Sequence, residues 1–293
     1  MKIARFQNKG EEHYGVFQND RLLCLDALAK RTKTILPNKI DDFISNQKAQ
    51  ETAEKLLTET KSSDLNAVFI PLTETILLAP IASPPKILCL GLNFLTHVTE
   101  TNEKPPEEPV VFMKPHTAIL GPNDKIIKRP FVKELDYEGE LAIVIGKKAK
   151  DVPVAEALNY VFGYTILNDV SARDFQFRSS QWTLGKSFDT FSPIGPYITT
   201  RNQLPDPDNL RIKTWVNGEL RQDGNAHDMI FSVAQIVHHL SRVMTLEPCD
   251  IIATGTPSGV AMAMKPPKWL KTGDTVRIEI EGIGTLENTI QEK

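Results

Sequence analysis

The segment that most constrains this chain is ELDYEGELAIVIG, residues 134–146, where acidic residues lead directly into an apolar run. The stretch from Leu141 to Ile145 predicts a buried strand. Asp136, Glu138 and Glu140 are spaced two apart, and side chains two apart in a strand lie on the same face. Carboxylates crowded in this way repel one another, and their burial is costly. The segment therefore predicts either a solvated edge or a nearby positive charge that compensates them.

A divalent metal ion would provide that charge. Mg²⁺ and Mn²⁺ prefer oxygen ligands, and two or three carboxylates offset the charge of the ion. A further ligand is expected from another strand end. Asp169 is a candidate, because it follows the apolar stretch YTIL in GYTILNDVSARDFQFR. An Asn-Asp pair after a strand also forms ordinary turns, so this residue alone does not decide between the two interpretations.

The chain divides into two predicted parts. Residues 1–78 form a small N-terminal α/β module, with strands in KIARF and HYGVFQNDRLLCL, a hairpin tip at QND and one or two helices within residues 39–60. Three prolines, Pro80, Pro84 and Pro85, then mark a connector.

Residues 79–293 are rich in short strands, and only 153–160 and 230–245 predict helices, the second capped by Ser232. Strands and helices do not alternate regularly. This pattern favours an α+β fold that is mainly β over a doubly wound sheet.

Composition excludes several classes of protein. A formal net charge of −3 and the lack of a basic run argue against nucleic-acid binding. No segment has the ~18 uncharged apolar residues of a membrane span. Cys24, Cys89 and Cys249 are far apart and form no CxxC pair, which argues against a disulfide framework or a structural zinc site and predicts a cytoplasmic protein.

Two further clusters contain residues that suit catalysis. In LGLNFLTHVTETNEKPP, His97 and Glu100 would share a face of a helical turn, and a carboxylate there can orient an imidazole for general-base work. A His three residues before a Glu is also common by chance. In QWTLGKSFDTF, Lys186 lies between Gly185 and Phe188, as expected for a partly buried cation facing an anionic substrate. The alternative is a lysine that reaches the surface.

Two loops are candidates for substrate contact. The turn in IIATGTPSGV, which contains Thr256, offers backbone N–H groups and hydroxyls to a carboxylate. It lacks the spacing of a phosphate loop. The charged, proline-containing stretch near residues 98–110 has the composition of a mobile lid.

Taken together, the motifs resemble the fumarylacetoacetate hydrolase family, in particular its shorter acylpyruvate hydrolase and hydroxymuconate isomerase members. The resemblance extends from about Pro84 to the C-terminus. It rests on motifs in a fixed order: KILCLGLNFLTH, FMKPHTAILGP, DYEGELAIVIGKKAKDV, GYTILNDVSARDFQ, QWTLGKSFDTFSPIGP, TLEPCDIIATGTPSGV and GDTVRIEIEGIGTLEN. It implies a mixed β-sandwich roll, a homodimer and a site for Mg²⁺ or Mn²⁺.

The resemblance also implies roles for individual residues. The metal ligands map to Glu138, Glu140 and Asp169. The catalytic residues map to His97, Glu100 and Lys186, and the substrate contacts to Arg173, Gln176 and Thr256. Asp136 remains as an expected hydrogen-bond acceptor beside the ligands. The sequence departs from the family pattern at Cys249 and Ala261, where glycine is usual, and at Leu90, where the long fumarylacetoacetases have a further Asp ligand.

We therefore expect a metal-dependent hydrolase that cleaves a C–C bond in a 2,4-dioxo acid to leave a pyruvate enolate. His97, oriented by Glu100, would take a proton from water, and Lys186 would hold the developing oxyanion. Thr256 and Arg173 would fix the substrate carboxylate. Alternatives on the same site are oxaloacetate decarboxylation, isomerisation of 2-hydroxymuconate-type acids and dehydration of sugar acids. A non-catalytic binding protein is the alternative from another class.

Overall fold

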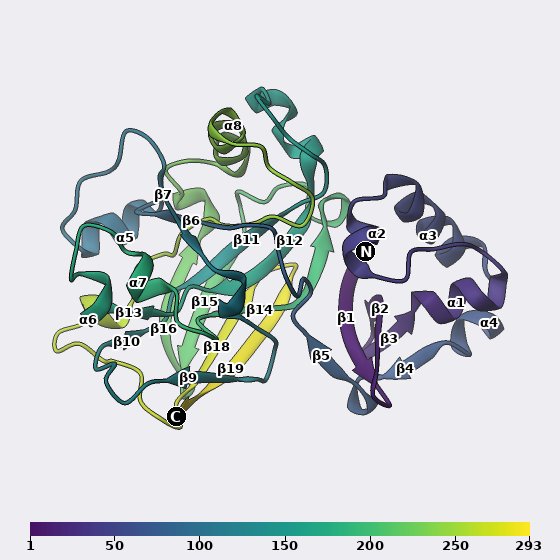
Figure 1. Ribbon diagram of the computed structural model, residues 1–293, viewed down its shortest axis with the longest axis horizontal. Coiled ribbons are helices and arrows are strands. Elements are labelled where there is room, and N and C mark those ends of the chain that lie inside the picture. The colour runs from purple at the N-terminus through teal and green to yellow at the C-terminus, as the bar shows by residue number, and fades with distance from the viewer.

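The computed structural model describes residues 1–293, and its N-terminal module lies beside a larger unit (Figure 1). The elements of the module are β1 Lys2–Asn8, β2 Glu11–Gln18, β3 Arg21–Cys24, α1 Leu25–Thr32, α2 Ile40–Ile44, α3 Gln47–Glu59, α4 Ser62–Asn66, β4 Phe69–Pro71 and β5 Ile76–Leu78. The predicted hairpin tip is confirmed at Asn19 and Asp20, which both have positive φ, as tight hairpin turns require. The helices predicted within residues 39–60 are α2 and α3.

The larger unit contains fourteen strands and four α-helices. These are β6 Ile87–Gly91, α5 Leu95–Glu100, β7 Val110–Lys114, β8 Ile119–Leu120, β9 Lys125–Lys128, β10 Leu135–Asp136, β11 Gly139–Ile145, β12 Val161–Asn168, β13 Ser171–Ala172, α6 Arg173–Gln176, α7 Thr183–Lys186, β14 Ser192–Thr200, β15 Arg211–Val216, β16 Glu219–Asn225, α8 Val233–Val243, β17 Ile251–Ala253, β18 Thr275–Ile280 and β19 Gly284–Glu292.

Both predicted helices of this unit exist. Helix α8 begins after Ser232, whose side chain accepts a hydrogen bond from Gln235 N, while the Gln235 side chain accepts one from Ser232 N. This reciprocal capping satisfies two backbone donors and fixes where the helix starts. Residues Val154–Tyr160 form a 3₁₀-helix rather than an α-helix.

One large sheet runs through both parts of the molecule. Its order is β4-β3-β2-β1-β14-β12-β11-β17-β6-β7, with β5 also pairing β1 and β8 also pairing β14. The two parts join where β1 pairs antiparallel with β14, with Lys2 opposite Thr199 and Ile3 opposite Ile198. The division of the chain into domains at residue 78 stays a prediction, but the sheet itself is continuous across it.

A second sheet of five strands, β16-β15-β18-β19-β9, lies against the first. Strand β11 explains why the predicted run is apolar on both faces. Leu141 and Ile143 belong to a core shared with the second sheet, whereas Ala142 and Val144 belong to a core shared with the N-terminal module. A strand buried on both faces has no need of polar residues.

The fold is α+β and mainly β, with mixed parallel and antiparallel pairing, as the sequence predicts. The longest helix, α3, has 13 residues, and none of the helices combines the length and the apolarity needed to cross a membrane.

Candidate active site

Three carboxylates converge where β11 begins and β12 ends. Glu138 precedes β11, Glu140 is its second residue and Asp169 follows β12. The strands hold these residues in register, because Asp169 N donates to Glu138 O at 2.9 Å and the Asn168 side chain accepts from Glu138 N at 3.1 Å. All three carboxylates are buried, and one oxygen from each lies within 4.8 Å of the others.

Buried cations surround two of these carboxylates. Lys186 Nζ donates to Glu138 Oε2 and to Asp169 Oδ2, at 2.8 Å each. Lys114 Nζ donates to Asp169 Oδ1 and to the backbone oxygen of Phe191. Arg173 Nη2 lies 2.6 Å from Glu138 Oε1. Every oxygen of Glu138 and Asp169 therefore contacts a cation.

Glu140 is held differently. Its Oε2 accepts a hydrogen bond from Gly255 N at 2.8 Å, and no cationic side chain contacts it. Burial and the neighbouring Asp169 and Glu138 raise the pKa of Glu140 well above its usual value. Burial also opposes ionisation of Glu138, but Lys186 and Arg173 outweigh it and lower the pKa of that group to about 2. Glu138 and Glu140 are only two residues apart in sequence, yet their surroundings shift their pKa values in opposite directions.

Asp136 does not share a strand with the two glutamates. It ends β10, which pairs with β13 rather than continuing into β11. Its Oδ1 accepts from Ala261 N at 2.8 Å, and its Oδ2 accepts from Arg173 Nε at 2.9 Å. The predicted continuous strand with three carboxylates on one face is wrong, because the chain changes partner after Asp136. The expected role as a structural hydrogen-bond acceptor agrees with these contacts.

A close approach of two short helices brings Lys186 to the carboxylates. Helix α7 packs on α6 at Gly185, where an added Cβ would lie 2.5 Å from the backbone nitrogen of Gln176. Only a glycine allows the helices to lie this close. Lys186 follows directly and is buried, so the alternative of a lysine that reaches the surface is wrong.

His97 and Glu100 form the predicted pair on α5. Nδ1 of His97 lies 2.8 Å from Oε1 of Glu100, and Oε2 of Glu100 accepts from Gly259 N at 2.8 Å. The carboxylate thus holds one ring nitrogen and is itself fixed by the backbone. Such a pair sets the tautomer of the imidazole and leaves Nε2 for proton transfer.

The turn from Gly255 to Gly259 connects the carboxylates with this pair. Its two end glycines have φ of 97° and 106°, a region that favours glycine, and their N–H groups bind Glu140 and Glu100. From the sequence, this turn is a candidate for holding a substrate carboxylate. In the structure two of its N–H groups hold carboxylates of the protein itself.

A buried glutamine of the second sheet fastens the turn. Gln222, on β16, donates to Thr256 Oγ1 and to Pro257 O, at 2.8 Å each, and accepts from Gly139 N at 3.0 Å. Thr256 Oγ1 donates to Gly139 O at 3.0 Å. The hydroxyl of Thr256 therefore already has two protein partners.

These groups open into one pocket. Its lining includes His97, Glu138, Glu140, Arg173, Gln176, Lys186 and Thr256, together with Leu90, Gly91, Leu92, Thr101, Glu103, Phe112, Phe177, Trp182 and Met262. Trp182 and Phe112 form an edge-to-face pair on the apolar side, with ring centroids 5.8 Å apart. Thr101 and Glu103, from the segment predicted to be a lid, reach the pocket, while mobility of that segment stays a prediction.

Most of the polar lining consists of residues that the motifs predict, and two buried supporting residues do not follow from them. Arg173 and Gln176 line the pocket, and Arg173 Nη1 donates to Gln176 Oε1 at 2.9 Å. Their contact with substrate stays a prediction, as do the assigned catalytic roles. Lys114 and Gln222 were missed. Lys114 stands in the quoted motif FMKPHTAILGP and is followed by a proline, but nothing in the motif shows that its side chain is buried.

The carboxylates fit a hard divalent cation. All three offer oxygen, the ligand type that Mg²⁺ and Mn²⁺ prefer, and a carboxylate has lone pairs beyond those its present contacts use. Four buried carboxyl groups, those of Asp136, Glu138, Glu140 and Asp169, are near only three cationic side chains, those of Lys114, Arg173 and Lys186. Glu140 is the carboxyl group without a cationic contact, so a divalent cation bound here would favour its ionisation most.

Comparisons with known proteins match both parts of the chain. A family model described as fumarylacetoacetate (FAA) hydrolase C-terminal matches residues 86–291, and one described as Rv2993c-like, N-terminal matches residues 1–80. The Rattus norvegicus protein named oxaloacetate tautomerase Fahd2a, mitochondrial, is 46% identical over 222 residues, which cover 75% of this chain and 71% of that protein.

Two solved structures match over essentially their whole length. A fumarylacetoacetate hydrolase from Exiguobacterium antarcticum is 37% identical with a TM-score of 0.84 and covers 100% of both chains. A maleylpyruvate hydrolase from Sphingobium sp. SYK-6, in complex with manganese(II) and pyruvate, is 30% identical with a TM-score of 0.80 and covers 100% of this chain and 99% of that chain.

Proposed function

This chain belongs to the fumarylacetoacetate hydrolase family, and from that premise we propose that it interconverts the keto and enol forms of a small 2-oxo acid of the oxaloacetate type. The observation that carries the proposal is one pocket lined by Glu138, Glu140 and His97. The two glutamates belong with Asp169 to a cluster of carboxylate oxygens that could hold a metal, and one ring nitrogen of the histidine is held by Glu100. The identity to a relative named as an oxaloacetate tautomerase supports the choice of substrate.

The metal would be Mg²⁺ or Mn²⁺, held by Glu138, Glu140 and Asp169. Bound there, such a cation stabilises negative charge that develops on the oxygen of a 2-oxo group. Its charge would also change the electrostatics of the pocket, because two positive charges exceed the one negative charge that Glu140 would contribute on ionisation. A dianionic substrate then meets a net positive site.

His97 would move the proton. In the enol-to-keto direction the enol hydroxyl loses a proton and C3 of the substrate gains one. Glu100 would accept a hydrogen bond from Nδ1–H of His97, so Nε2 is the nitrogen available for this exchange. Lys186 and Arg173 hold Glu138 in its ionised form and in place. The aromatic pair of Trp182 and Phe112 covers one side of the pocket and limits access of water.

C–C bond hydrolysis of an acylpyruvate-type 2,4-dioxo acid is the second candidate. The His97–Glu100 pair favours it, because the same Nε2 can take a proton from water that attacks the distal carbonyl. Likeness to a maleylpyruvate hydrolase structure that contains pyruvate supports it as well. Both candidates require stabilisation of an enolate next to a carboxylate and differ in whether water attacks. Oxaloacetate decarboxylation remains the third use of that site.

One experiment separates these reactions. The protein, saturated with Mn²⁺, is given oxaloacetate enol and acetylpyruvate in parallel, and enol absorbance and pyruvate release are followed for wild type and His97→Ala. Fast loss of enol without pyruvate, slowed about 10²–10⁴-fold in the variant, is the expected result. Pyruvate from acetylpyruvate would establish hydrolysis instead, and pyruvate released from oxaloacetate faster than with Mn²⁺ alone would establish decarboxylation. Equal rates in wild type and His97→Ala would contradict the role of the histidine.

A further inference from the structure

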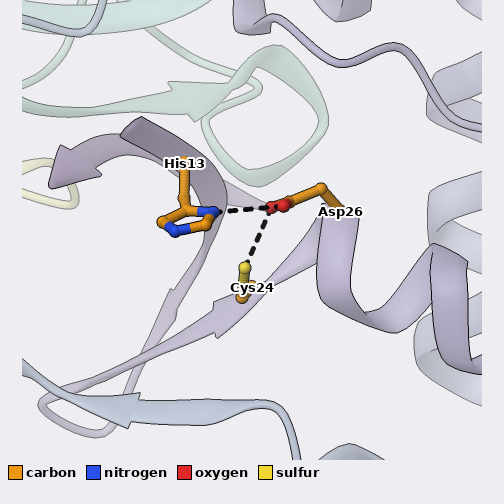
Figure 2. A group of neighbouring side chains, drawn as sticks. All are labelled: His13, Cys24 and Asp26. Atoms are coloured by element: carbon orange, nitrogen blue, oxygen red, sulfur yellow. Dashed lines mark hydrogen bonds and ion pairs between the residues drawn. The ribbon is translucent and has the colours of Figure 1, made fainter. Parts of the chain in front are cut away.

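A second cluster of possible metal ligands lies in the N-terminal module. His13 comes from β2, Cys24 ends β3 and Asp26 lies in the first turn of α1 (Figure 2). His13 Nδ1 is 3.1 Å from Asp26 Oδ2, and Cys24 Sγ donates to Asp26 Oδ1 at 2.9 Å. In Figure 2 the imidazole and the thiol approach the same carboxylate from two sides. The cluster contacts none of the residues that line the active-site pocket.

The donor types differ from those of the active site. A thiolate, an imidazole nitrogen and a carboxylate oxygen are the ligands that Zn²⁺ takes, whereas Mg²⁺ does not favour sulfur. Around a tetrahedral Zn²⁺, with bonds of about 2.0–2.3 Å, such donors lie about 3.3–3.7 Å apart. The imidazole and the thiol lie 3.1 Å and 2.9 Å from the two oxygens of Asp26, and one donor atom from each of the three side chains lies within 4.8 Å of the others. Side-chain movements of about 1 Å would bring these donors to the separations of a zinc site.

The backbone holds the three residues in place without help from their side chains. His13 is opposite Phe6 in the pairing of β2 with β1, and Cys24 is opposite Gly15 in the pairing of β3 with β2. Cys24 N also donates to Val68 O at 3.1 Å. Ligands fixed on rigid elements lose little entropy when a metal binds.

An ion can reach the cluster from solvent. Cys24 is buried, but the side chains of His13 and Asp26 are 17% and 19% exposed. That edge leaves room for a fourth ligand from solvent, as in zinc sites with three protein ligands. Without a metal, burial and the hydrogen bond to Asp26 raise the pKa of the Cys24 thiol to about 12, so the sulfur keeps its proton.

We propose that His13, Cys24 and Asp26 form a second metal site, which takes a borderline transition-metal ion such as Zn²⁺ and not Mg²⁺. On binding, the thiol proton of Cys24 is released to solvent and the S–H···O hydrogen bond is replaced by a bond from sulfur to the metal. The ion would tie β2, β3 and α1 together. The site stabilises the N-terminal module and takes no part in the chemistry of the active-site pocket.

Co²⁺ is a suitable probe, because a bound thiolate gives it a charge-transfer band that oxygen ligands do not. The full chain is first given excess Mg²⁺ to occupy the oxygen-only site and is then titrated with Co²⁺. We expect a near-ultraviolet band that saturates at one equivalent and that one equivalent of Zn²⁺ removes. Absence of the band in the wild type overturns the proposal.

Variants assign the band to the cluster. Cys24→Ser should abolish it, and Cys249→Ser, which changes a buried thiol elsewhere, should leave it intact. A band that persists in Cys24→Ser overturns the proposal. Because Cys24 is buried, the more accessible His13→Gln gives a second test: the affinity for Co²⁺ should fall at least about tenfold while turnover of oxaloacetate enol is unchanged. Unchanged Co²⁺ affinity in His13→Gln also overturns it.

Discussion

The two clusters of possible metal ligands stabilise their buried polar groups in different ways. Around Glu138 and Asp169, three cationic side chains contact the carboxylates, and all of these groups are buried. Around Asp26, no lysine or arginine makes contact, and a thiol and an imidazole supply the hydrogen bonds. The first cluster contains several buried charges that depend on one another, whereas the second contains one carboxylate and is partly exposed to water.

The difference predicts how each region responds to the loss of one group. Removing one partner from a buried ion cluster leaves other charges uncompensated, which is strongly destabilising. Removing one hydrogen-bond partner at a partly exposed position costs far less, because water replaces it.

The largest expected effect separates two glutamates of the same cluster. In metal-free protein, Glu138→Gln should lower the free energy of unfolding by about 3 kcal/mol or more, because Lys186 and Arg173 lose their shared counter-ion. Glu140→Gln is the matched control, since Glu140 contacts no cation and a glutamine oxygen can still accept from Gly255 N. We expect its stability to be unchanged or raised.

Urea unfolding in the presence of a chelator measures this contrast, and Mn²⁺ titration should show that both variants lose tight metal binding. Equal destabilisation by the two substitutions would mean that the cations do not distinguish Glu138 from Glu140. Full Mn²⁺ affinity in Glu140→Gln would remove that residue from the ligand set.

The next effect tests whether packing positions the cations. Gly185→Ala places a Cβ against the backbone of Gln176 and should push α7 away from α6, at a cost of about 1–3 kcal/mol. Lys186 moves with the helix, so enol turnover should fall even at temperatures at which the variant remains folded. Leu184→Ala changes the adjacent residue, which is 66% exposed, and should alter neither. Thermal unfolding and enol turnover of the two variants provide the comparison.

A smaller effect tests the support from the second sheet. Gln222→Leu removes the hydrogen bonds to Thr256, Pro257 and Gly139, and should lower kcat by about 10–100-fold. Since one turn binds both Glu140 and Glu100, affinity for Mn²⁺ should fall together with kcat. Loss of kcat with unchanged affinity for Mn²⁺ would show that the turn does not couple the position of Glu140 to that of Glu100.

The smallest effect belongs to the N-terminal cluster. Asp26→Asn in metal-free protein should lower the free energy of unfolding by only about 1 kcal/mol, because an amide oxygen replaces one acceptor and solvent reaches the position. Urea unfolding under the conditions used for Glu138→Gln measures it. A cost near 3 kcal/mol would contradict the contrast between the clusters.

Local spacing carried most of the sequence prediction. Glu138 and Glu140, two residues apart, and His97 and Glu100, three apart, converge because the short-range geometry of strands and helical turns brings them together. Asp136 breaks the pattern at a change of strand partner, for which no local residue gives a signal. Lys114 and Gln222 come from strands elsewhere in the molecule, and neither their burial nor their partners can be read from their neighbours in sequence.

The pairing of β1 with β14 also cannot be predicted from local sequence, since it joins residues almost two hundred positions apart. Such contacts depend on the completed tertiary structure. The family motifs start after the prolines, so they carried no information about how the N-terminal module attaches.

The pairing of β1 with β14 has a consequence for any attempt to shorten the protein. Deleting residues 1–78 would strip β14 of its neighbour over Ile198 and Thr199 and would uncover the apolar faces of Ala142 and Val144. Unpaired strand edges beside exposed apolar surface recruit other chains. The truncated unit should therefore self-associate, with the lost neighbour replaced by a second copy of itself.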